Sequence, residues 1–162
     1  MKLESNRLFI IPCTAESIQL AEQQHYNNGP QMENYVKALA EDPTLLNWGT
    51  WLVLLKDSGT LIGDIGFKGK PDNNKAVEIG YGFLEEYWHK GYATEAVTEL
   101  IDWAWATGAV EVIKADTELG NHGSVRVLEK MNMQKIAESE SLLYWKLEKP
   151  VHFGERTFPV KG

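Results

Sequence analysis

The sequence predicts a single α/β domain built on a mixed sheet. Three consecutive strand-like segments joined by short turns are typical of an antiparallel meander. A strand–helix–strand unit over residues 76–117 then requires a parallel pair with a right-handed crossover. The length of 162 residues is enough for one domain to bury most of a core. We expect residues 1–148 to form this domain, and residues 149–162 to be an extension of it or a tail.

The first third of the chain is expected to supply one strand and two helices. The apolar run 8–11 ends at Pro12, and Thr14 is a suitable cap for the helix that follows. The turn signal at residues 27–30 ends that helix. A second helix is predicted from apolar residues at three- and four-residue spacings, namely Met32, Tyr35, Val36, Leu39 and Ala40.

The remaining elements follow from turn signals and a change of hydrophobic period. Residues 57–59 and 71–74 carry the Asp, Asn, Ser, Gly and Pro of turns, so they separate three strands at 50–55, 61–67 and 76–84. The rest of the pattern predicts a helix at 92–106, a strand at 111–117, a helix capped by Asn121 that ends near Met131, and strands at 133–137 and 142–147. The expected order is therefore β-α-α-β-β-β-α-β-α-β-β.

Composition excludes several classes of protein. The net charge is −7 and the basic residues are scattered, which argues against nucleic acid as a partner. An acidic surface suits a basic substrate, although solubility alone also explains it. No apolar run approaches the roughly 20 residues of a membrane span, and the N-terminal residues lack the apolar stretch of a secretion signal. Cys13 is the only cysteine, which excludes an internal disulfide and favours a cytoplasmic location.

The stretch from Glu78 to Ala96 carries the chemical signal. Glycines at positions 80 and 82 weaken a strand unless its backbone bulges or lies close to a ligand. A loop containing Gly91 then runs directly into the long helix, whose first turn has free N–H groups and a positive dipole end. Such a strand beside such a helix start can hold an extended ligand that has a pyrophosphate at one end.

Two segments resemble the signatures of the GCN5-related N-acetyltransferases, in particular the branch that acetylates ribosomal-protein N-termini. The first is Trp88-His89-Lys90-Gly91-Tyr92-Ala93, in which Trp88 replaces the usual Arg or Gln. The second starts at Asn121 and includes Ser124 and the pair Glu129-Lys130. The likeness spans roughly residues 3–147 and implies the GNAT fold, with acetyl-CoA as co-substrate and no metal. Homodimers are frequent in this family.

The resemblance also implies where the cofactor binds. The family holds the pantetheine arm between two splayed parallel strands, here 76–84 and 111–117, and the pyrophosphate on amides of the following loop. An amide at Gly82 or Phe83 would bind the thioester carbonyl and stabilise the oxyanion. The cofactor-binding residues that we predict are Gly82, Phe83, Leu84, His89, Lys90, Gly91, Tyr92, Ala93, Thr94 and Asn121.

Two residues are predicted to be catalytic. Glu78 lies where some family members carry a general base, and the alternative is a solvent-facing or ion-paired strand carboxylate. Ser124 falls where the ribosomal-protein branch has a serine near the sulfur, so the resemblance implies a hydrogen bond to the leaving thiolate, and the alternative is a small helix residue that allows close packing. Leu128 occupies the position at which many relatives of this family have a tyrosine that protonates the leaving thiolate.

The sequence therefore predicts an acetyl-CoA-dependent N-acetyltransferase that acts on a primary amine by direct attack in a ternary complex. The acceptor is a protein N-terminus or a small amine, and in this family the first two helices wall its site. The alternative is a non-catalytic acyl-CoA-binding or sensing domain of the same fold. A P-loop or dinucleotide-binding enzyme is excluded because neither glycine motif occurs. No histidine pairs with Asp, Glu or Cys at metal-ligand spacing.

Overall fold

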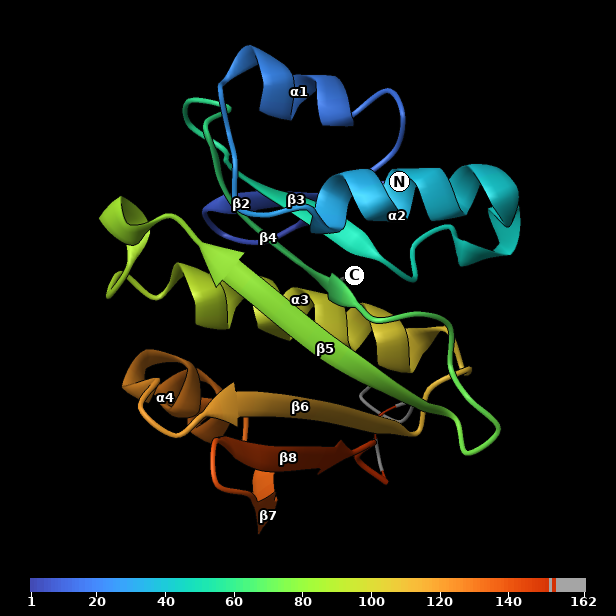
Figure 1. Cartoon of the computed structure of the whole chain (residues 1–162), viewed down its shortest axis with the longest axis vertical. Helices are drawn as coiled ribbons and strands as arrows, with labels where there is room; N and C mark the ends of the chain where they lie inside the picture. The colour runs from blue at the N-terminus through green and yellow to red at the C-terminus, as the bar shows by residue number, and fades with distance from the viewer. Residues whose placement is uncertain (152, 154–162) are drawn as a thin grey trace, which may run out of the picture.

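One sheet of eight strands organises the chain, in the order β1-β2-β3-β4-β5-β6-β8-β7 (Figure 1). The computed structural model describes residues 1–151 and 153, so most of the predicted extension at 149–162 lies outside the described residues. The strands are β1 (Leu3–Glu4), β2 (Leu8–Pro12), β3 (Thr50–Leu55), β4 (Leu61–Phe67), β5 (Ala76–Phe83), β6 (Val112–Glu118), β7 (Gln134–Glu138) and β8 (Leu142–Glu148). The helices are α1 (Ile18–Gln23), α2 (Gln31–Glu41), α3 (Tyr92–Ala106) and α4 (His122–Lys130), with short 3₁₀ turns at Pro43–Leu45 and Glu85–Tyr87.

The predicted fold class and the predicted order of elements are confirmed, with one additional strand. β1 pairs with β2 in an antiparallel hairpin, and its two residues are too few for a periodic pattern to reveal. The expected cap at Thr14 is wrong, because α1 begins after Ser17. The Thr14 hydroxyl instead accepts a hydrogen bond from the Ser17 N–H, 3.0 Å away, in a turn ahead of the helix.

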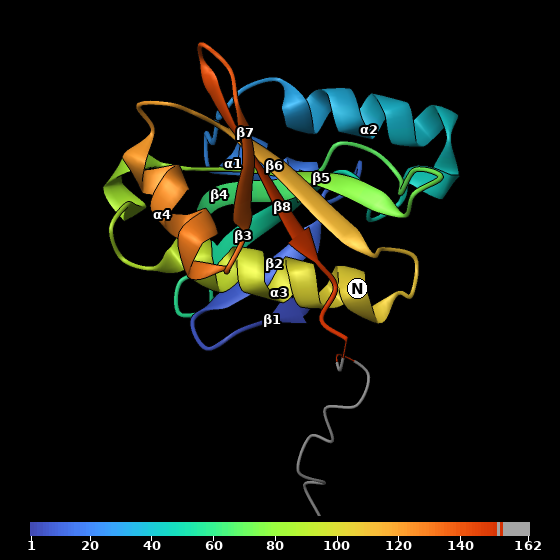
Figure 2. The same ribbon diagram turned by 90° about the horizontal axis from the view of Figure 1, so that it is seen from below.

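The two faces of the sheet carry separate hydrophobic clusters. Figure 2 shows α2 on one face and α3 on the opposite face. The apolar side of α3, including Val97, Leu100 and Ile101, packs on the sheet in the larger cluster. The smaller cluster joins Ala21 of α1 and Met32 of α2 to strands β3 and β4. No helix in the described part of the chain is long and apolar enough to cross a membrane.

The parallel pairing of β5 with β6 is short. β5 and β6 pair over three positions, from Ala76 with Val112 to Glu78 with Lys114. Among the described residues, β5 then continues to Phe83 without a strand partner on that side, while the opposite edge of β6 pairs with β8 along the whole length of β6. Figure 1 shows the two strands diverging toward their carboxyl ends. The splayed pair predicted for strands 76–84 and 111–117 is therefore present.

Candidate active site

The open edge of β5 presents the main-chain groups of alternate residues. In an antiparallel ladder, successive residues direct their N–H and C=O groups to opposite sides of the strand. The Glu78 carbonyl accepts from the N–H of Lys68, directly after β4, and the Leu84 N–H donates to the Ile62 carbonyl of β4, each at 2.9 Å. The even-numbered residues of β5 thus face β4, and the main-chain groups of Tyr81 and Phe83 face the opening toward β6.

An indole contact fixes the end of this edge. The Trp88 Nε1–H donates a hydrogen bond to the Phe83 carbonyl oxygen, 2.7 Å away. Since the N–H and C=O of one strand residue point to the same side, the Phe83 N–H also faces the opening. Gly82 is paired with Asp64 of β4, so its N–H points away from the opening. Of the two amides predicted to bind a thioester carbonyl, only that of Phe83 faces the opening.

The loop before α3 and the first turn of this helix form a run of free amides. Within residues 1–151 and 153, no N–H from His89 to Thr94 has an intramolecular hydrogen-bond partner. His89 and Gly91 both adopt left-handed backbone conformations, with φ of 62° and 82°. Such turns direct successive amides into a shared concavity, and the helix dipole adds positive potential there. The predicted residues 89–94 therefore form a site suited to an anion such as a diphosphate.

An ion pair that the sequence analysis missed fixes the start of α3. The Arg7 Nε lies 2.8 Å from Glu95 Oε1, and the Arg7 main-chain N–H donates to Glu95 Oε2, also at 2.8 Å. The guanidinium lies over the Tyr92 ring, 4.2 Å from its centroid. Arg7 and Glu95 are 88 positions apart in the sequence, so no local spacing of residues could have predicted that they pair.

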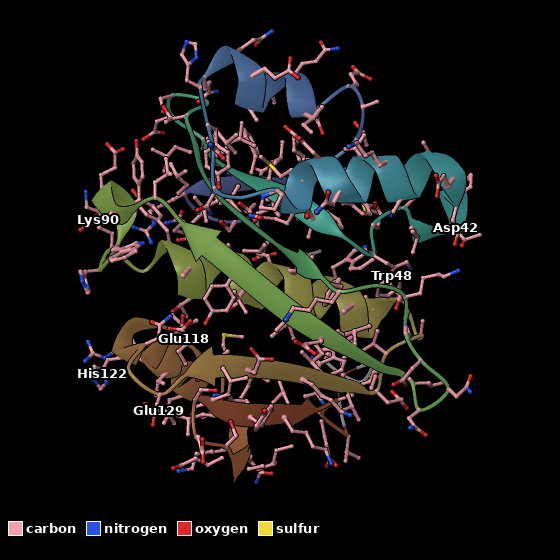
Figure 3. All side chains as sticks on the ribbon, in the orientation of Figure 1. Asp42, Trp48, Lys90, Glu118, His122 and Glu129 are labelled. Carbon is pink, nitrogen blue, oxygen red and sulfur yellow. The ribbon has the colours of Figure 1, made fainter. Side chains whose placement is uncertain are left out.

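The carboxyl end of β6 leads into α4, as expected. The Asn121 Oδ1 accepts a hydrogen bond from the Ser124 N–H at 3.1 Å, which confirms Asn121 as the cap of this helix. Leu128 is completely buried in the core, so its position offers no proton donor. We call residues 89–94 the amide loop. Figure 3 shows His122 of α4 and Lys90 of the amide loop, both exposed, at the end of the sheet where β5 and β6 have separated.

A tyrosine that the sequence analysis did not single out spans the opening. The Tyr81 hydroxyl donates a hydrogen bond to the main-chain carbonyl of Ser124, 3.3 Å away. Burial raises the pKa of Tyr81 to about 12, so the hydroxyl remains protonated at neutral pH. The Ser124 side chain is half-buried next to this contact. The Tyr81 hydroxyl therefore joins β5 to the first turn of α4 across the opening.

Glu78 forms an ion pair. Its Oε2 lies 2.5 Å from the Nζ of Lys68, and the hydrogen bond that Lys68 donates to this carboxylate raises the pKa of Lys68. Glu78 is also the last β5 residue that pairs with β6, so it lies before the strands separate. This is the ion-paired arrangement that the sequence analysis held as the alternative. The role of Glu78 as a base stays a prediction.

A cavity of about 320 Å³ lies on the side of β5 that carries α1 and α2. The strands contribute Gly80 and Gly82 of β5 and Asp64 of β4 to its lining. The helical side contributes Asn28, from the segment between α1 and α2, and Gln31, the first residue of α2. A Cβ at position 82 would lie 2.8 Å from the Asn28 amide nitrogen. Glycine at this position thus leaves the space that the Asn28 side chain occupies.

The comparisons with known proteins agree with this geometry. A family model described as the acetyltransferase (GNAT) domain matches residues 12–134. The chain belongs to the GNAT acetyltransferase family. The GNAT domain is 35% identical over 96 residues to the uncharacterized N-acetyltransferase YjdG of Bacillus subtilis, a match that covers 59% of this chain and 57% of YjdG. The chain thus spans less than two thirds of the length of this relative.

Solved structures share the fold of this GNAT domain. The ribosomal-protein-S5-alanine acetyltransferase of Vibrio fischeri superposes with a TM-score of 0.72 at 17% identity, over 93% of this chain and all of that chain. The ribosomal L7/L12 acetyltransferase RimL, in complex with coenzyme A, gives a TM-score of 0.70 at 15% identity, over 91% of this chain and 98% of that chain. At such identities, the likeness establishes the fold alone. In the described part of the chain, no group of His, Cys, Asp and Glu could hold a metal ion.

Proposed function

We propose that this GNAT chain transfers the acetyl group of acetyl-CoA to a primary amine by direct attack in a ternary complex. The observation that carries the proposal is the divergence of β5 from β6 beside a run of unpartnered amides at residues 89–94. An open strand edge suits the polar, extended pantetheine arm, and the amides suit the diphosphate. Both features lie at the carboxyl end of the same strand.

Main-chain groups do most of the binding in this proposal. The amides from His89 to Thr94 hold the diphosphate, and Lys90 adds a positive charge from inside the loop. The main-chain N–H groups of Gly82 and Leu84 face β4, so these two residues contact the pantetheine arm through their other atoms. Asn121 contacts the same arm from the start of α4 while it caps that helix. The Arg7–Glu95 pair keeps the first turn of α3 in position.

Acetyl-CoA would supply an activated thioester carbonyl. The Phe83 N–H is aimed into the opening, where it would donate to the oxyanion that forms as the amine attacks. The Ser124 hydroxyl would donate to the sulfur as the thiolate leaves. Glu78 would accept the proton of the incoming ammonium, directly or through water, if its ion pair with Lys68 opens. Holding both reactants in one cleft supplies much of the remaining acceleration.

The acceptor in this proposal is a protein N-terminus or a small amine. Fold neighbours named as ribosomal-protein acetyltransferases support the first class, and the limited volume of the cavity next to β5 supports the second. The net charge of −7 suits a cationic acceptor of either kind. The buried free thiol of Cys13 accords with a cytoplasmic location.

Acetyl-CoA turnover with a panel of small amines and short peptides tests the proposal, with products identified by mass spectrometry. We expect an acetylated amine to accumulate as free coenzyme A is released. Gly91→Glu is the matched negative control, because it places a carboxylate among the amides that hold the diphosphate. Tight acetyl-CoA binding without turnover across a broad panel would instead favour the sensing domain.

A further inference from the structure

Asp64 is a buried carboxylate that the proposed transfer chemistry does not use. Asp64 is only 4% exposed, and it lies in the middle of β4, paired with Gly82 of β5. A carboxylate in such a place is destabilised by desolvation unless positive charge or hydrogen bonds compensate it. Among the described residues, no Lys, Arg or His forms an ion pair with Asp64.

In the described part of the chain, the hydrogen-bond donors to this carboxylate are all neutral. Oδ2 accepts hydrogen bonds from the Tyr26 hydroxyl at 2.6 Å and from the Asn28 amide at 3.1 Å. Oδ1 accepts from the Gln31 amide, also at 3.1 Å. An ionised carboxylate offers about four acceptor positions, so one position on Oδ1 remains available to a ligand.

The groups around Asp64 cannot neutralise it. Burial, followed by the Asp64 charge, raises the pKa of Cys13 to about 12, and the same two causes raise the pKa of Tyr26. Lys68 lines the same cavity, but its ammonium is paired with Glu78. The negative charge on Asp64 is therefore left for a cationic ligand.

The cavity connects this charge with the open strand. It has a volume of about 320 Å³, and Asp64 shares its lining with Gly80, Tyr81 and Gly82. The edge of β5 that faces β6 is the edge to which we assign the thioester. Because Asn28 and Gln31 also line the cavity, a ligand in it would approach β5 from the face of the sheet that carries α1 and α2, opposite the face covered by α3.

We propose that Asp64 binds the ammonium group of the acceptor and thereby selects protonated primary amines over uncharged nucleophiles. Tyr26, Asn28 and Gln31 hold the carboxylate in place, so these three act as positioning residues. This inference rests on the proposed acetyl transfer, because it assigns the acceptor side of the same site. The net charge of the chain does not say where a cationic acceptor would bind, whereas this inference assigns that role to one buried carboxylate.

The test compares two probes of the same shape. Phenethylamine is protonated at neutral pH, whereas its isostere O-benzylhydroxylamine is uncharged. We expect the wild-type protein to bind phenethylamine at least about tenfold more tightly, measured by calorimetry with and without coenzyme A. Asp64→Asn should abolish this preference while the affinity for coenzyme A is retained. Asp57→Asn, which removes the same charge from the exposed turn between β3 and β4, should preserve the preference.

The wild-type comparison needs no variant, so it applies even if Asp64→Asn fails to fold. Equal affinity of the wild-type protein for both probes, or binding of neither, would overturn the inference. Retention of the preference in a folded Asp64→Asn variant would also overturn it. Charge-selective binding without any turnover would leave the Asp64 assignment intact and would count against acetyl transfer, so the two failures are distinguishable.

Discussion

The Tyr81 hydroxyl donates its hydrogen bond to the main-chain carbonyl of Ser124, 3.3 Å away, and not to the Ser124 side chain. This contact links β5 to α4 across the opening between the two parallel strands. The main-chain and side-chain roles of Ser124 can therefore be separated by mutation. The carbonyl accepts the tyrosine hydrogen bond, whereas the side-chain hydroxyl has no hydrogen-bond partner among the described residues.

Ser124→Ala tests the proposed hydrogen bond to the leaving thiolate. We expect kcat to fall about tenfold with little change in the affinity for coenzyme A, because the hydroxyl would act only as charge develops on sulfur. The Tyr81 contact should survive, since it uses the main chain. Steady-state kinetics and calorimetry give the two quantities. An unchanged kcat would leave Ser124 as a residue that only allows close packing.

Tyr81→Phe tests the link itself. Removing the hydroxyl should lower the free energy of unfolding by about 1 kcal/mol, the usual net value of a neutral hydrogen bond. Urea unfolding measures this difference. Because burial raises the pKa of Tyr81 to about 12, the pH–rate profile of the wild-type protein should show no limb from this residue between pH 6 and about pH 9. Unchanged stability would mean that the contact contributes nothing to holding α4.

Gly91→Ala and Gly108→Ala form a matched pair at the two ends of α3. Both glycines have a left-handed backbone, with φ of 82° and 74°, so both variants should lose about 1–2 kcal/mol of stability. Only position 91 lies in the amide loop, where a Cβ would be 3.3 Å from an Arg7 nitrogen. Only Gly91→Ala should therefore weaken coenzyme A binding, and Gly91→Glu should weaken it at least about tenfold. Calorimetric titration separates the two positions, and equal affinities for coenzyme A would contradict the loop assignment.

Glu95→Gln and Glu99→Gln should change stability in opposite directions at neutral pH. Burial raises the pKa of Glu95, but hydrogen bonds from Ser5 and Arg7 outweigh it, so the net shift is downward. Glu95 therefore stabilises the fold at pH 7, and we expect Glu95→Gln to lower the free energy of unfolding by about 1–2 kcal/mol. Burial and the neighbouring charges of Asp102 and Glu95 raise the pKa of Glu99, so Glu99→Gln should stabilise.

The pH dependence supplies the check on this pair. The stabilisation by Glu95 is present above its ordinary pKa of about 4.5 and is lost as the pH falls through the lowered value in the folded state. The deficit of Glu95→Gln should thus shrink below about pH 4. The gain from Glu99→Gln should vanish over the acidic range in which that raised group becomes protonated. Urea unfolding from pH 3 to pH 8 would refute both assignments if the two variants behaved alike.

Glu78→Gln, compared with Lys68→Met, tests the predicted base. If Glu78 accepts the proton of the ammonium, Glu78→Gln should lower kcat at neutral pH and alter the pH–rate profile. Lys68→Met breaks the same ion pair but keeps the carboxylate, so it should retain the rate. A purely structural ion pair would instead give both variants the same small effect, because exposed pairs contribute at most about 1 kcal/mol.

Local patterns in the sequence were sufficient to predict most of the elements. The helix predicted from apolar spacing at α3 and the strands predicted from apolar runs and turn signals appear in the structure within a residue or two of the expected bounds. The cap at Asn121 and the glycine-containing loop ahead of α3 were predictable as well, because a cap and a turn each depend on a few adjacent residues. The amides at 89–94 follow from the same local rules.

Tertiary structure alone decided which distant groups meet. The orientation of the Phe83 amide depends on the β4–β5 register, which no short segment encodes. The Arg7–Glu95 pair and the donors around Asp64 join residues that lie tens of positions apart, so only the folded sheet brings them within hydrogen-bond distance. Sequence thus determined where backbone amides become available. Three-dimensional packing determined which edge they face and which carboxylate is left without a cation, because both depend on contacts between strands and helices that are far apart along the chain.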